Sequence, residues 1–114
     1  MDFEITRDGG FATASLSGLA LLEGWEEMLP RLGAQTAGDQ RLLIVIAGLV
    51  GFLGNPERRM VGELAATHLR HVQRVAMLVP PEKHTGVTEQ EARRRGLEFR
   101  VFSDRDKALD WLRD

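Results

Sequence analysis

The chain has 114 residues, a length that suits one domain with its own hydrophobic core. Its formal net charge of -2 argues against a nucleic-acid-binding surface, which normally carries an excess of basic residues. The absence of cysteine excludes disulfides, thiolate metal ligands and cysteine nucleophiles. Neither a signal peptide nor a membrane-spanning segment is evident, so we expect a single cytoplasmic domain over residues 1–114.

The first residues predict an antiparallel hairpin. Phe3 and Ile5 alternate with polar residues over 3–7, as in a half-buried strand. Residues 8–10 read Asp-Gly-Gly, which is typical of a tight turn. The alternation resumes over 11–17, where the alanines and Leu16 are expected to face the core.

An amphipathic helix is predicted next, because apolar residues recur at spacings of three and four. Its expected apolar stripe consists of Leu21, Leu22, Trp25, Met28, Leu29 and Leu32. Pro30 falls inside this pattern and should kink the helix or split it in two. Residues 33–40 are predicted to form a polar connection.

Residues 42–47 predict the central strand, because they are all apolar and include three consecutive β-branched side chains. An unbroken apolar strand has both faces covered, as in a parallel sheet with helices on each side. Asn55 is expected to cap a helix over 56–71 that begins with Pro56. The inner stripe of that helix is expected to comprise Val61, Leu64, Ala65, His68 and Val72.

The last third predicts two more strands, each followed by a helix. A strand over 73–79 should stop at the two prolines that follow it. Thr88 and Glu91 have the spacing of a capping box for a helix over 89–95, which Gly96 should end. A strand over 97–102 and a helix capped by Ser103 complete the order ββαβαβαβα. This order predicts an α/β domain with a mixed, mostly parallel sheet.

The segment 48–55 is the first place to look for function, since ligands tend to bind at the carboxyl ends of strands in α/β sheets. Its large apolar side chains need cover from the core, from a second protein or from an apolar ligand. With the start of the next helix, it gives our candidate ligand- or partner-binding residues, which are Leu49, Val50, Phe52, Leu53, Asn55, Arg58, Arg59 and Met60.

Other chemistries find little support. The glycines of 48–54 match neither a dinucleotide fingerprint nor a P-loop, although a helix start with two arginines leaves anion binding as a minor alternative. The three histidines show no pattern of converging metal ligands. The arginine run 93–95 is balanced by nearby glutamates, and no pair of side chains suggests acid–base or nucleophilic catalysis. We therefore expect no catalytic residue, no metal and no cofactor.

The order of elements, the LLIVIA strand and the closing residues 100–112 resemble the SpoIIAA-like family of the STAS fold over essentially the whole chain. These are small bacterial proteins related to anti-sigma-factor antagonists. The resemblance implies a mixed sheet with packed helices, no metal, and a role in binding rather than catalysis. The wider group is also similar to the lipid-binding lobe of Sec14-type proteins, which adds an apolar ligand to the alternatives.

One departure from the family pattern bears on function. Antagonists of this fold carry a phosphorylatable Ser or Thr at the start of the helix after the central strand, but residues 47–54 here read AGLVGFLG. We expect an interaction module that forms a homodimer or binds a regulatory protein without that switch. The alternative is a carrier of a small apolar or lipid-like ligand, which a closed pocket lined by Leu49, Phe52, Met60 and Leu64 would favour.

Overall fold

The computed structural model describes all 114 residues and contains the predicted order of strands and helices. Besides one 3₁₀ turn, η1 (Pro81–Lys83), the elements are β1 (Asp2–Asp8), β2 (Phe11–Leu19), α1 (Leu22–Gln35), β3 (Arg41–Val50), α2 (Asn55–His68), β4 (Arg74–Leu78), α3 (Val87–Arg94), β5 (Phe99–Phe102) and α4 (Arg105–Arg113).

The five strands form one mixed sheet in the order β1-β2-β3-β4-β5. β1 and β2 are antiparallel and the other neighbours are parallel, which confirms the predicted hairpin and the mostly parallel sheet. β3 lies in the middle, with Leu42, Leu43 and Ile44 at most 1% exposed. Its burial on both faces explains why its sequence is continuously apolar.

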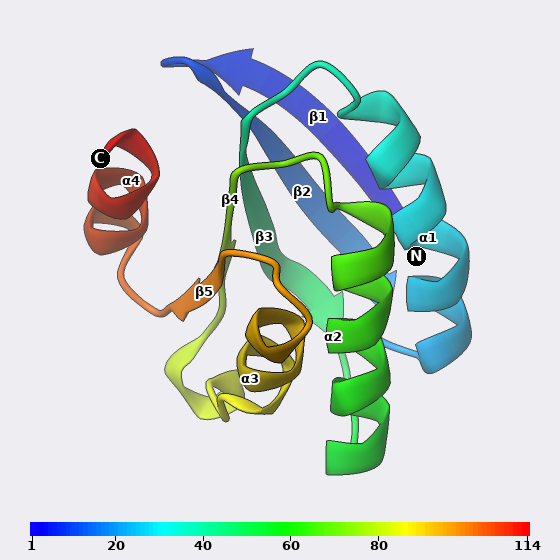
Figure 1. Ribbon diagram of the computed structural model, residues 1–114. Helices are drawn as coiled ribbons and strands as arrows, with labels where there is room; N and C mark the ends of the chain where they lie inside the picture. Colours follow the sequence, from blue (N-terminus) through cyan, green and yellow to red (C-terminus); the bar gives the residue numbers. More distant parts are fainter.

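Helices cover the two faces unequally (Figure 1). α1, α2 and α3 lie on one face, over the larger hydrophobic core that includes Trp25, Leu32 and Phe99. α4 alone lies on the other face, where Ala108 and Leu112 pack against β3 and β4. Guanidinium groups hold the end of α4, since Arg41 donates to the carbonyl of Leu112 and Arg74 to that of Trp111.

Several predicted details are confirmed. Ala12, Ala14 and Leu16 are buried, as the alternation in β2 predicts. Pro80 and Pro81 follow the end of β4 and lead into η1. Gly96 follows α3 with a φ of 96°, the left-handed conformation expected after a helix.

Other details are wrong. Pro30 lies inside one helix, α1, so of the two predicted effects the split into two helices is excluded; Leu21 precedes the helix and is 53% exposed. α2 ends at His68, so Val72 lies beyond it, although its side chain is buried. Leu21 and Val72 share one reason, since apolar spacing can continue into the residues that flank a helix and therefore does not fix where the helix begins or ends.

The predicted helix caps are also wrong by one or two positions. Gly54 rather than Asn55 precedes α2, and its N–H donates to the carboxylate of Glu57 at 3.2 Å. Asp104 rather than Ser103 caps α4, through N–H groups of the first turn. Thr88 and Glu91 form no capping box, because α3 begins at Val87 after Gly86.

No helix of the structure combines the length and apolarity that crossing a membrane requires.

Candidate functional site

The predicted apolar loop is partly strand. β3 continues to Val50 and pairs with β2 as far as Leu19. This extension separates the apolar side chains, since Leu49 is 5% exposed and belongs to the core, whereas Val50 is 65% exposed. Leu53 packs partly buried against the core, and Phe52 is 67% exposed. Of the three predicted sources of cover, the core therefore accounts for Leu49 and part of Leu53, while Val50 and Phe52 remain uncovered in the single chain.

The large apolar side chains that remain exposed come from the ends of β2 and β3, from the residues that follow these strands, and from the first two turns of α2. Five residues form this set, and we call them the apolar edge: Leu19, Leu21, Val50, Phe52 and Met60, each between 45% and 67% exposed. Sequence reasoning found the last three but missed Leu19 and Leu21. The sequence does indicate these two leucines. They flank Ala20 at the end of β2, and β2 pairs in parallel with β3, whose end carries the predicted residues.

Lys83 ties the segment after β3 to the turn after β4. Its Nζ donates to the carbonyl oxygen of Leu49 at 3.2 Å and lies 5.1 Å from the centre of the Phe52 ring. Both contacts are typical of an ammonium group that stabilises a loop through a backbone acceptor and an aromatic face. Phe52 is thus held in place although its side chain is exposed.

A pocket of about 70 Å³ opens between this segment and the starts of α2 and α3. Phe52, Leu53, Lys83 and Gly86 are among the residues around it. Its buried apolar lining comprises Trp25, Ile46, Leu49, Val61, Met77, Val79 and Val101. Of the four residues predicted for a ligand pocket, Leu49 and Phe52 line it and Met60 and Leu64 do not.

The charged side chains around the pocket are two cations and one carboxylate. Arg58 is half-buried and forms no ion pair, and Lys83 retains two N–H groups beyond its bond to Leu49. Glu89 is the one carboxylate, and its Oε2 accepts from the N–H of Val101 at 2.6 Å. Of the other predicted site residues, Asn55 and Arg59 are exposed and do not line the pocket.

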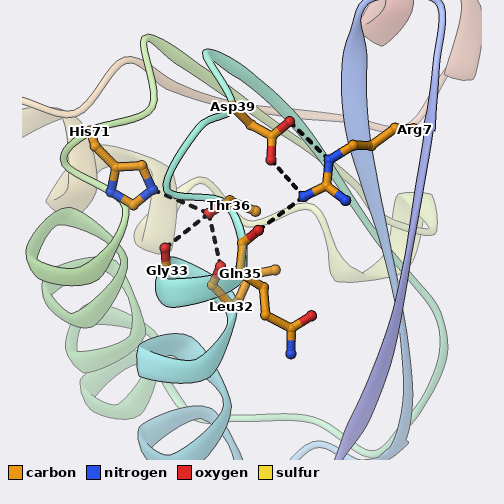
Figure 2. Close-up of polar contacts among 7 residues, drawn as sticks. All are labelled: Arg7, Leu32, Gly33, Gln35, Thr36, Asp39 and His71. Carbon is orange, nitrogen blue, oxygen red and sulfur yellow. Dashed lines mark hydrogen bonds and ion pairs between the residues drawn. The ribbon is translucent and has the colours of Figure 1, made fainter.

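A polar cluster lies at the opposite edge of the sheet (Figure 2). Thr36 is fully buried, and its hydroxyl donates to the carbonyl of Leu32 at 2.8 Å and contacts His71 Nε2 at 3.2 Å. Nearby, Arg7 pairs with Asp39 at 2.8 Å, and the hydrogen bond followed by the charge of Asp39 raises the pKa of Arg7. These contacts join the end of α1 to the loop after α2 and to β1, so their role is structural.

The described side chains offer no metal centre, because nowhere do three histidine or carboxylate groups converge. His68 is half-buried on α2, whereas His71 and His84 are exposed and lie on different loops.

The topology and the packing define a STAS domain. The SpoIIAA-like family model matches residues 13–113, and the chain therefore belongs to the SpoIIAA-like family. None of the curated proteins matches it significantly.

Solved structures agree with this assignment. An uncharacterised protein of the DUF3478 family from Shewanella loihica PV-4, with a SpoIIAA-like fold, is 28% identical, with 97% of this chain and 92% of that chain covered and a TM-score of 0.63. An anti-sigma factor antagonist from Mycobacterium paratuberculosis is 15% identical. The match covers 99% of this chain and 94% of that chain, with a TM-score of 0.69. RsbS from Moorella thermoacetica, as a variant with a single substitution, is 16% identical. The match covers 99% of this chain and 96% of that chain, with a TM-score of 0.64. The last two show likeness of fold alone.

Proposed function

We propose that the protein is a non-enzymatic interaction module that binds another protein through the apolar edge, and that its first partner is a second copy of itself. The observation that carries the proposal is the 45–67% exposure of Leu19, Leu21, Val50, Phe52 and Met60, of which Leu19 and Val50 lie opposite each other in the register of β2 and β3. Exposed apolar groups that lie together mark interaction surfaces in soluble proteins.

The fixed position of Phe52 supports the same proposal. An aromatic side chain that is already held before binding loses little conformational entropy when a partner covers it. Lys83 provides this restraint through its contacts with Phe52 and Leu49. The segment 47–54 contains no Ser, Thr or Asp, so the module is proposed to act without a phosphorylation switch at that point.

A mass measurement in solution tests the proposal. Sedimentation equilibrium of the wild-type chain should give a dimer, and Phe52→Asp should shift it to a monomer because a buried unpaired carboxylate opposes association. Ala37→Asp adds the same charge to an exposed loop at the opposite edge and should leave the dimer intact. An unchanged mass for Phe52→Asp would show that the apolar edge is not the dimer interface.

A monomeric wild-type chain would exclude self-association and leave a regulatory protein as the occupant. Cross-linking from a photoreactive side chain at position 52 in the producing cells then tests that occupant, with the same probe at position 37 as the control. The alternative of a lipid carrier is disfavoured by size, since drug-sized ligands occupy roughly 300–1,000 Å³. The pocket has about 70 Å³.

A further inference from the structure

The pocket beneath Phe52 has a chemical character of its own. Most of its lining is apolar, but Arg58 and Lys83 are present without a carboxylate partner for either. An apolar cavity close to cations favours a ligand with a hydrocarbon body and an anionic head. This observation is independent of whether the apolar edge binds protein.

One buried donor beside the pocket is unsatisfied. Trp25 lines the pocket, is 5% exposed, and its Nε1 is the only buried side-chain polar atom of the structure without a hydrogen-bond partner. A buried N–H without an acceptor costs about 1–3 kcal/mol, so such groups in native proteins usually have a partner that completes them. Because this N–H is itself shielded from the pocket, the ring of Trp25 forms part of the pocket wall, and its indole signal reports on what fills the pocket.

Charge and size narrow the ligand class. The two cations and the Glu89 carboxylate leave one net positive charge around the pocket, which matches a monoanion better than a dianion. A cavity of about 150 Å³ holds benzene, so one of half that volume holds roughly three non-hydrogen atoms, which is the size of a short hydrocarbon tail whose anionic head lies at the cations. The pocket volume of about 70 Å³ is of that order.

We propose that this pocket binds a short-chain monocarboxylate. The carboxylate pairs with Arg58 and Lys83, and the hydrocarbon part covers the apolar lining, which includes the ring of Trp25. Arginine suits this role because its planar fork can bind both oxygens of a carboxylate.

The two tryptophans make the test direct. Trp111 lies against the other face of the sheet with Phe102, so its indole signal serves as an internal control. In a ¹H–¹⁵N correlation spectrum, sodium propionate and sodium butyrate should shift the Trp25 indole signal saturably and leave that of Trp111 in place. Trp25→Phe assigns the two signals, and propionamide and inorganic phosphate are the comparison probes.

Two variants locate the carboxylate. Arg58→Gln should weaken propionate binding by about tenfold or more, the effect of losing a charge-assisted hydrogen bond. Arg59→Gln removes the neighbouring exposed guanidinium, which does not line the pocket, and should leave the affinity unchanged. The same spectra show whether each variant is folded.

The proposal is overturned by any of three results: no saturable shift of the Trp25 indole, equal binding of propionamide and propionate, or tighter binding of phosphate than of either carboxylate. An affinity that Arg58→Gln and Arg59→Gln lower equally would also overturn it, because the anion would then not be held in the pocket. None of these results bears on the mass of the protein in solution. The sedimentation experiment therefore tests the interaction proposal independently.

Discussion

The ammonium group of Lys83 lies over the ring of Phe52, with Nζ 5.1 Å from the ring centre. The two residues come from different connections, one after β4 and the other after β3. Both residues also line the pocket. Phe52 is the one aromatic residue of the apolar edge, and its position therefore depends on a residue about thirty positions further along the chain.

Replacing Lys83 should loosen the segment after β3. Lys83→Met keeps most of the side-chain length but removes the hydrogen bond to Leu49 and the contact with Phe52. We expect a loss of about 0.5–1.5 kcal/mol in the free energy of unfolding and faster amide exchange at 50–54, measured by urea denaturation and hydrogen exchange. Lys107→Met on the exposed side of α4 is the control. Equal exchange rates in the two variants would show that Lys83 does not restrain the segment.

A methyl group at position 33 should destabilise the protein although it favours the helix. A Cβ at Gly33 would lie 2.3 Å from the carbonyl oxygen of His68, so α1 and α2 would have to move apart. Helix propensity alone predicts a gain of about 1 kcal/mol for Gly33→Ala, whereas overpacking predicts a loss of about 1–3 kcal/mol. We expect the loss, measured as a lower urea midpoint.

Gly24→Ala is the matched control, because Gly24 lies in the same helix and its Cβ would meet mainly the side chain of Met1, at 3.2 Å. A flexible terminal side chain can give way, so this change should be near neutral or slightly stabilising. If Gly33→Ala proved as stable as Gly24→Ala, the close approach of α1 to α2 would not constrain the fold.

The order of the elements was predictable because it depends on local patterns. The apolar run of β3 and the alternation in β2 report burial directly, and parallel order follows from the alternation of strands with helices. Helix ends were predicted less well, because a cap depends on which neighbour supplies a partner. Thr88 illustrates this, since its hydroxyl donates to the carbonyl of Arg58 on α2 instead of capping α3.

The candidate site was predicted in position but not in composition. Phe52 and Met60 stood out as apolar residues near a helix start, and Arg58 as a cation beside them. Lys83 and Trp25 were missed as site residues because they lie 25 or more positions from Arg58 in sequence, and only the parallel arrangement of strands brings them to one pocket. No local pattern carries that information.

The buried hydroxyl of Thr36 should contribute more to stability than an exposed one. Thr36→Val preserves shape but removes the hydroxyl that donates to the carbonyl of Leu32 and contacts Nε2 of His71 (Figure 2). We expect a loss of about 1–2 kcal/mol in the free energy of unfolding, measured by urea denaturation. Thr67→Val removes a hydroxyl that donates to Glu63 on the exposed side of α2 and should change stability by less than about 0.5 kcal/mol. Equal losses would mean that burial of the Thr36 hydroxyl is irrelevant.

Stability should fall in acid partly because of Glu91. The hydrogen bond from Arg94, followed by that from Arg95, lowers the pKa of Glu91 below its ordinary value of 4.5. A carboxyl whose pKa is lower in the folded state stabilises the protein above its unfolded pKa, and this contribution is lost as the pH falls through the folded value. Arg95 also contacts Glu63 on α2 at 3.4 Å, so protonation of Glu91 weakens contacts where α3 meets α2.

Glu91→Gln should therefore lower the urea midpoint at about pH 7, and this difference should shrink as the pH falls below 4.5 and the wild-type carboxyl takes up a proton. Glu98→Gln, which removes an exposed carboxylate that forms no ion pair, is the charge-matched control. A carboxyl carbon titration by NMR should place the midpoint of Glu91 below 4.5. A midpoint at or above that value would show that the two arginines do not stabilise the carboxylate, since a stabilised anion must give up its charge at a lower pH.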